Sequence, residues 1–124
     1  MGLIRTKIAL SNPRNEKLAP IIVDALADTG ALHLCIPQHI ALQLGLEEAE
    51  KREVITSDSK KVLYSYVGPI TVKFQNRSCF TGALVLGDEV LLGAVPMEDM
   101  YLVVSPGMRT ITVNPDSPNI AMSI

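Results

Sequence analysis

The 124-residue sequence has no tryptophan, only two cysteines and two histidines, and a net charge of only −2. The nearly balanced charge argues against nucleic-acid binding, which needs a concentrated excess of lysine and arginine. No apolar run approaches the ~18 residues of a membrane-spanning helix, so no membrane partner is expected. The cysteines form no CxxC pair, and neither a metal site nor a cofactor is expected.

The two cysteines, Cys35 and Cys79, lie far apart in strand-like segments. The N-terminal residues contain no long apolar segment of the kind that a signal peptide carries. We therefore expect two reduced, buried thiols in a cytoplasmic protein. A disulfide, or a metal pair that recruits His33 or His39, is the alternative.

The chain is expected to form one domain over residues 1–124, since its length fits one domain and 48% of its residues are apolar. Short strand-like runs alternate with turn residues, which is typical of an all-β barrel, here with one main short helix. The expected strands cover residues 2–10, 18–26, 32–36, 53–56, 61–67, 70–74, 78–86, 101–104 and 110–113, and helical turns cover 37–45 and 96–100.

Local patterns give four further expectations. Residues 21–23 are an unbroken apolar run, which predicts a strand buried on both faces. Residues 47–53 are highly charged and are expected to form a solvated connection. Gly68-Pro69 is expected to break the chain. Pro37 is expected at the first position of the helix.

The tripeptide Asp28-Thr29-Gly30 occurs once, between two strand-like segments. An apolar strand leads into it, and a second strand, followed by Pro37, leads out. A tight turn therefore presents one carboxylate. Water activation by two carboxylates needs a second aspartate that faces the first. A chain with one such turn can supply that aspartate only by pairing with a copy of itself.

A second motif, Leu91-Leu92-Gly93-Ala94, lies roughly sixty residues beyond the aspartate and precedes a helical turn. With Asp28-Thr29-Gly30-Ala31, the helix ending at Leu44-Gly45-Leu46 and the following hairpin, it resembles the retropepsin-like (retroviral-type, clan AA) aspartic proteases. The similarity is greatest to single-domain bacterial and archaeal members and covers residues 18–100. It implies an acid-protease β-barrel that forms a C2 homodimer and acts as an aspartic-type endopeptidase on peptide or protein substrates.

The resemblance also implies roles for individual residues. Asp28 would be the catalytic aspartate, Thr29 would reach across the dimer axis to the partner's loop, and Gly30 would let the turn pass where a Cβ would clash. Leu91-Leu92-Gly93 would pack behind this loop. The hairpin tip Ser57-Asp58-Ser59-Lys60 would be a flap that closes over the substrate. The implied substrate-binding residues are Ala31, Ser57, Asp58 and Ser59.

Two features depart from related enzymes. Ala31 stands where pepsin-like enzymes carry a hydroxyl, and the lost hydrogen bond should favour the protonated carboxyl. We therefore expect a pH optimum nearer mildly acidic or neutral values than that of pepsin. The hairpin tip has no glycine, so Asp58 and its serine neighbours must form the turn with less tolerant residues.

Three functions remain open at this point. The first is a homodimeric aspartic endopeptidase. The second is a non-catalytic peptide-binding or dimerisation module on the same fold, because fold does not fix function. The third is a small structural β-barrel in which Asp28 only accepts backbone N–H bonds in a turn. Asp24, which has no glycine turn, is expected on an exposed face with a structural role.

Overall fold

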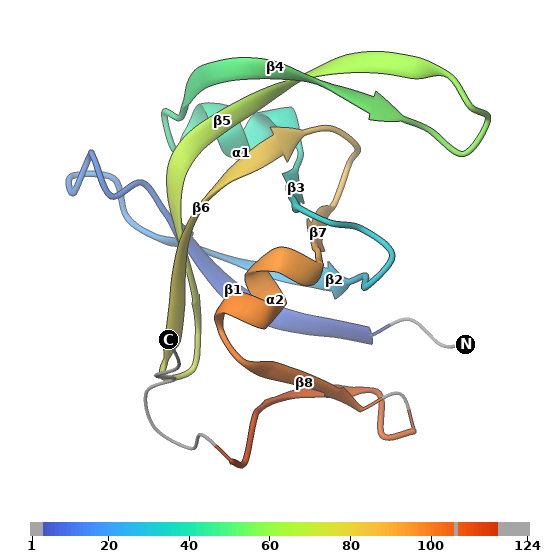
Figure 1. Cartoon of the computed structure of the whole chain (residues 1–124). Coiled ribbons are helices and arrows are strands. Elements are labelled where there is room, and N and C mark those ends of the chain that lie inside the picture. Colours follow the sequence, from blue (N-terminus) through green and yellow to red (C-terminus); the bar gives the residue numbers. More distant parts are fainter. Residues whose placement is uncertain (1–3, 106, 117–124) are drawn as a thin grey trace.

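The computed structural model describes residues 4–105 and 107–116, and its elements are drawn in Figure 1. The strands are β1 (Ile4–Ser11), β2 (Ile21–Ala27), β3 (Leu34–Ile36), β4 (Glu47–Ile55), β5 (Lys61–Phe74), β6 (Arg77–Val85), β7 (Val90–Leu92), β8 (Leu102–Ser105) and β9 (Thr110–Val113), and the helices are α1 (Gln38–Gln43) and α2 (Ala94–Asp99). The predicted all-β class with few short helices is confirmed. The predicted strand start at residue 2 and the aperiodic tail beyond residue 116 lie outside the described residues.

A six-stranded barrel has the order β1-β2-β7-β3-β6-β5 and closes because β1 pairs with both β2 and β5. β2 runs parallel to β7, and β3 runs parallel to β6. Parallel strands end at the same edge of a sheet. The segments that follow β2 and β7 therefore lie together, which brings residues 28–31 next to residues 93–95.

Alternating residues of the barrel strands form the core. Leu10, Ile70 and Leu92 are fully buried, and burial of each such side chain contributes about 1.5–3 kcal/mol. The helices seal the barrel with apolar residues: α1 buries Ile40, and α2 buries Met97. The outward-facing residues of the same strands remain in contact with solvent.

The β4–β5 hairpin projects beyond the barrel (Figure 1). Its register runs from the pair Glu47↔Gly68 to the pair Ile55↔Lys61. The predicted connection over residues 47–53 is therefore a strand, although its residues are mostly exposed, as expected. β4 is exposed along most of its length, so its sequence has no apolar alternation that would reveal a strand. Backbone pairing with β5 and exposed ion pairs such as Lys51–Glu48 hold it instead.

The expectation of a chain break at Gly68-Pro69 is also wrong, because β5 continues through both residues. The register against β6 shifts between Val67 and Ile70. Such a bulge bends a strand and increases its twist without ending it. Extra residues in β5 are therefore absorbed at the point where the hairpin leaves the barrel.

Burial of residues 21–23 on both faces is a further wrong expectation, because Ile22 is 64% exposed. β2 forms part of a barrel wall, and only one face of a wall points to the core. Two smaller differences concern the next elements. β3 begins at Leu34, because the residues before it belong to the loop that contains Asp28. Pro37 is the N-cap of α1 and so precedes its first helical position.

β8 and β9 form a separate two-stranded sheet below the barrel in Figure 1. Both strands match their predicted positions closely. Ile111 of β9 is buried in the core cluster, and Met100, which precedes β8, is 1% exposed. The hairpin after α2 is therefore packed onto the domain by its apolar residues.

Candidate active site

The turn that contains Asp28 directly follows β2. The Asp28 N–H donates to the Leu92 carbonyl at 3.0 Å, and the Ala31 N–H donates to the Asp28 carbonyl at 3.1 Å. The Gly30 N–H donates to Asp28 Oδ1 at 2.9 Å. Asp28 is half-buried, whereas Thr29 and Gly30 are exposed. The turn thus holds one carboxylate at the surface, with one oxygen anchored by the backbone.

The second sequence motif packs behind this turn, as the resemblance implied. The Ala94 N–H donates to the Ala31 carbonyl at 2.8 Å, and the Val95 N–H donates to the Leu32 carbonyl at 3.0 Å. A Cβ on Gly93 would lie 2.7 Å from the Leu32 carbonyl carbon. Only glycine permits this close approach, so Gly93 fixes the position of the loop.

The tip of the β4–β5 hairpin forms a closed turn. The Thr56 N–H donates to the Lys60 carbonyl and the Ser59 N–H donates to the Thr56 carbonyl, both at 2.9 Å. Ser59 has φ +66°, the left-handed conformation that glycine would adopt at lower cost. The Thr56 hydroxyl donates to the Asp58 carboxylate, and this bond, followed by the Lys60 N–H, lowers the pKa of Asp58.

The predicted site residues therefore fall into two groups. Asp28, Thr29, Gly30 and Ala31 form one loop, and Ser57, Asp58 and Ser59 form the hairpin tip. Within residues 4–105 and 107–116, no hydrogen bond or ion pair joins the two groups. A single chain brings one carboxylate to the loop, and one carboxylate cannot act as acid and base at the same time.

A contact that sequence reasoning missed connects the hairpin to the loop that contains Asp28. The Arg52 guanidinium lies 3.7 Å from the ring centre of Tyr66. His33 meets the same ring edge-on, with the ring centres 6.0 Å apart. Burial, and secondly the charge of Arg52, lowers the pKa of His33. No sequence signal predicts this stack, since it depends on the register between β4 and β5.

Both cysteines are buried and free, as predicted. Burial, and secondly the charge of Asp28, raises the pKa of Cys35. Burial, and secondly the charge of Asp99, raises the pKa of Cys79 to about 12. Both side chains are therefore neutral thiols near pH 7, and neither is an activated nucleophile.

Two other results bear on the chemistry of the chain. In the described part of the chain, no group of three or more His, Cys, Asp or Glu residues is arranged to hold a metal ion. Over the same residues, no helix has the length and apolar character needed to cross a membrane.

Comparison with known proteins gives the following likenesses. The EIAV protease complexed with the inhibitor HBY-793 aligns with a TM-score of 0.58 and 20% identity, covering 79% of this chain and 88% of that one. The retroviral protease-like domain of Ddi1 from Leishmania major aligns with a TM-score of 0.58 and 10% identity, covering 93% and 90%. A retropepsin-like aspartic protease from Rickettsia conorii aligns with a TM-score of 0.49 and 17% identity, covering 78% and 71%. No protein-family model and no curated protein matches the sequence.

The likenesses extend over most of this chain and most of each matched chain, at 10% and 20% identity for the two with the higher TM-score. Likenesses at these identities bear on the fold alone. This chain has the retropepsin-like fold.

Proposed function

We propose that the protein is a homodimeric aspartic endopeptidase with one active site per dimer, built from the Asp28 carboxylates of two chains related by C2 symmetry. The observation that carries this proposal is the loop itself. It holds a single half-buried carboxylate at the surface, with Thr29 and Gly30 exposed beside it. A copy of the same loop is what would complete a two-carboxylate site.

The proposed chemistry follows from two carboxylates ~3 Å apart, which cannot both ionise cheaply and therefore share one proton. Aspartic proteases in general are the standard example of this effect. The ionised carboxylate takes a proton from a water molecule as the water attacks the peptide carbonyl carbon. The protonated carboxyl donates to the carbonyl oxygen, which becomes tetrahedral. The pair titrates as a unit, and the two roles are interchangeable in a symmetric dimer.

Further roles belong to the same proposal. Thr29 would bond to the partner's loop and keep the two carboxylates coplanar, and the Gly30 N–H would hold one carboxylate oxygen. Ala31 would contact substrate beside the carboxylates. The hairpin tip would act as a flap over the bound peptide, with Ser57, Asp58 and Ser59 as its contacts. A cytoplasmic location is also proposed, which the two free thiols support.

Asp28→Asn tests the proposal, with Asp24→Asn as the matched control. Asp24 lies four residues earlier, is exposed and pairs with Lys7 at 3.0 Å. We expect wild type and the control to cleave a diverse peptide library, and Asp28→Asn to cleave nothing while remaining a dimer. Mass spectrometry of the products and inhibition by a statine-type compound would identify the activity. Normal cleavage by Asp28→Asn would refute the proposal.

The hairpin tip favours a second candidate, a non-catalytic peptide-binding or dimerisation module. The tip has no glycine and is closed by the Thr56, Ser59 and Lys60 hydrogen bonds, so it resists opening more than a glycine-rich tip would. This candidate predicts a dimer that binds peptides without turnover. Peptide cleavage by purified wild type would eliminate it, and a monomer would contradict both candidates.

A further inference from the structure

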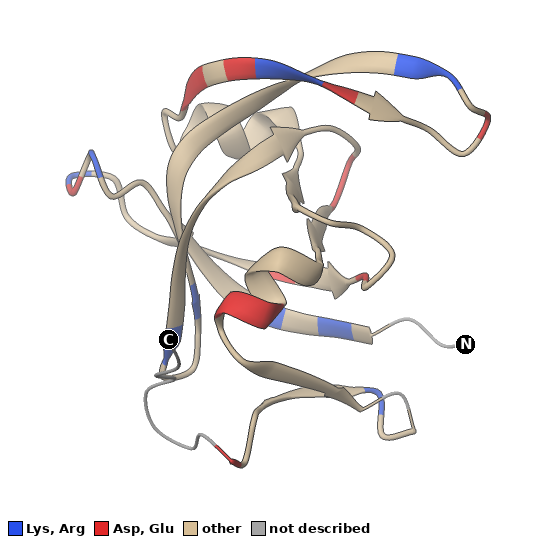
Figure 2. Ribbon diagram, viewed as in Figure 1, with Lys and Arg blue, Asp and Glu red and all other residues tan. Residues whose placement is uncertain are grey.

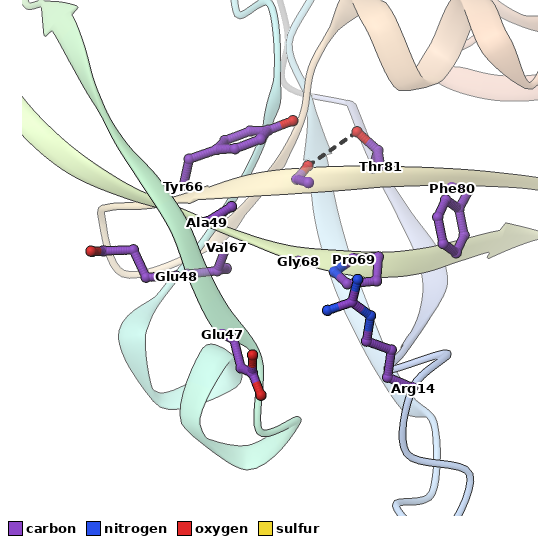
Figure 3. A pocket seen from close by; sticks show the side chains of 11 residues that line it. Arg14, Glu47, Glu48, Ala49, Tyr66, Val67, Gly68, Pro69, Phe80 and Thr81 are labelled. Atoms are coloured by element: carbon purple, nitrogen blue, oxygen red, sulfur yellow. Dashed lines mark hydrogen bonds between the residues drawn. The ribbon is translucent and has the colours of Figure 1, made fainter.

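A cavity of about 330 Å³ opens where the β4–β5 hairpin leaves the barrel (Figure 3). Residues 47–49 of β4, 66–69 of β5, 80–82 of β6 and Arg14 of the β1–β2 loop line it. None of these residues belongs to the Asp28 loop or to β7. The volume falls within the range of small-molecule sites, about 300–1,000 Å³, so the cavity is large enough for a ligand of its own.

The cavity exists because two ladders are interrupted at the same place. The β4–β5 register shifts between Glu48 and Glu50, and the β5–β6 register shifts between Val67 and Ile70. Gly82 leaves room for the ring of Tyr66, since a Cβ there would lie 2.6 Å from the tyrosine hydroxyl. Each bulge takes a residue out of the regular ladder, and together they open a hollow at the base of the hairpin.

The walls of the cavity are largely apolar, and its rim carries charge. The side chain of Phe80 is 67% exposed although it lies against the cavity. Tyr66 forms a second aromatic wall, and Pro69 also lines the cavity. An exposed aromatic side chain beside a hollow of this size indicates a surface suited to an apolar group.

The charges on the rim are of both signs. In Figure 3 the Arg14 side chain extends toward Gly68 and Pro69, and Glu47 lies on the β4 side. Among the described residues, the side chains of Arg14 and Glu47 have no hydrogen-bond or ion-pair partner. Glu48 differs, because Lys51 donates to it at 3.0 Å. Figure 2 shows the acidic residues at the start of β4.

We propose that this cavity binds a dipolar, amphipathic ligand: an amino acid or short peptide with an aromatic or branched apolar side chain. The side chain fills the space between Tyr66 and Phe80. The ligand carboxylate pairs with Arg14, and its ammonium group pairs with Glu47. A guanidinium is well suited to hold a carboxylate by two parallel hydrogen bonds.

The position of the cavity connects it to the hairpin. One register shift is in the β4–β5 ladder and the other is in the β5–β6 ladder, so both involve a strand that carries the hairpin tip, and a bound ligand stiffens the base of the hairpin. One consequence rests on the proposed function: hydrolysis of a peptide bond creates one new carboxylate and one new ammonium group. The carboxylate is on one product and the ammonium group is on the other, so a short product carries both charges when it also keeps its own other terminus. Such a product has the chemistry that the cavity accepts, and the cavity would act as a product-sensing site.

The test is a titration of the full chain, followed by NMR of backbone amides, with four probes. Phenylalanine carries both charges, N-acetylphenylalanine only the carboxylate, phenylalanine amide only the ammonium group, and N-acetylphenylalanine amide neither. We expect phenylalanine to bind with a Kd on the order of 1 mM. Each blocked group should weaken binding about tenfold. Shifted amides should cluster in residues 47–49, 66–69 and 80–82.

Two variants with matched controls identify the site. Arg14→Ala should remove the preference for a free carboxylate, whereas Lys17→Ala, in the same loop but outside the cavity, should not. Phe80→Ala should weaken all four probes, whereas Leu42→Ala, another exposed apolar residue at 72%, should weaken none. The proposal would be overturned by equal affinity for charged and neutral probes or by the absence of amide shifts in the cavity residues. It would also be overturned if Arg14→Ala kept the wild-type preference for a free carboxylate.

The titration does not depend on cleavage. Asp28→Asn should bind phenylalanine as wild type does, because Asp28 lies outside the cavity lining. An inactive wild-type protein that binds phenylalanine at the cavity would contradict the protease proposal and keep the cavity proposal. An active wild-type protein that does not bind it would do the reverse.

Discussion

Replacement of Gly93 by alanine should show how strictly the Asp28 loop is positioned. The added Cβ would lie 2.7 Å from the Leu32 carbonyl carbon and 2.8 Å from the His33 nitrogen, with the His33 carbonyl oxygen nearer still. All three contacts are with backbone, so no side chain can rotate away. The loop must move by roughly 0.5 Å or more, because interiors are close-packed. Overpacking of this kind costs about 1–3 kcal/mol.

Thermal unfolding at a fixed chain concentration measures this cost, since dimerisation makes the midpoint depend on concentration. For a chain of this size, 1 kcal/mol corresponds to a shift of roughly 4 °C, so the Gly93→Ala midpoint should fall by about 4–12 °C. Under the proposed function, kcat should also fall at least about tenfold, because the reacting groups are misplaced while peptide binding is retained.

Gly107→Ala is the matched control, because a Cβ at Gly107 meets nothing within 4 Å. Its unfolding free energy should change by less than about 0.5 kcal/mol. Equal melting temperatures for Gly93→Ala and Gly107→Ala would refute the claim that Gly93 sets the loop position. A lower melting temperature for Gly93→Ala with unchanged kcat would refute the link from loop position to chemistry.

Three other predictions concern the pKa values and the hairpin tip. Because the pKa of His33 is lowered, the folded state binds fewer protons at this residue than the unfolded state does. The contribution of His33 to stability is therefore complete above pH 6.5 and is lost as the pH falls. The decrease in the urea midpoint between pH 8 and pH 5.5 should be smaller in His33→Gln than in wild type. Cys35 and Cys79 should react with a thiol reagent at pH 8 only after denaturation, because their pKa values are raised. Ser59→Gly should be at least as stable as wild type in urea, because glycine adopts φ +66° without steric cost.

The histidine and hairpin-tip predictions each have a control on the same chain. His39→Gln makes the same substitution at an exposed histidine and is the matched control for His33→Gln. Ser57→Gly, which introduces glycine without relieving a left-handed residue, should lose about 0.5–1 kcal/mol. A Ser57→Gly variant that is more stable than Ser59→Gly would contradict the argument from φ at Ser59. Rapid thiol labelling of the folded protein would contradict the argument from the cysteine pKa values. A His33→Gln variant with the pH dependence of wild type would contradict the argument from the His33 pKa.

The barrel and the Asp28 turn could be predicted because their signals are local. Asp28, Thr29 and Gly30 are consecutive, and the apolar strand before them fixes which way the turn points. The Gly93 motif could also be found, because a short apolar run that ends in glycine marks a close backbone approach. The conformation of these segments depends on residues that are neighbours in sequence.

The β4–β5 hairpin was predicted too short for a physical reason. β4 is exposed, so its residues did not need to alternate between apolar and polar, and the charged run from Glu47 to Glu53 gave no strand signal. The bulge at Gly68-Pro69 was interpreted as a break because the sequence of a bulge and that of a turn are alike. Pairing partners, and not intrinsic preference, decide between the two.

The cavity and the aromatic stack were not predictable for the same reason. Arg14 and Phe80 come together only after two register shifts, and Arg52 meets Tyr66 only through the pairing of β4 with β5. A shift of one residue moves every side chain of a strand to the other face. Such contacts depend on the register between strands. The register is fixed by the pairing of all the strands together and not by any one segment of the sequence.

The Asp28 loop is held mainly by backbone hydrogen bonds, so Asp28→Asn can change the chemistry without unfolding the loop. Backbone bonds hold the loop: Asp28 N–H to the Leu92 carbonyl, Ala31 N–H to the Asp28 carbonyl and Ala94 N–H to the Ala31 carbonyl. Among residues 4–105 and 107–116, only the Gly30 N–H donates to the carboxylate. An asparagine oxygen in the same position can accept that bond with the same geometry. Asp28→Asn should therefore unfold within about 1 kcal/mol of wild type. An inactive variant with that stability would have lost chemistry alone, whereas a strongly destabilised one would mean that the charge of Asp28 helps to hold the loop.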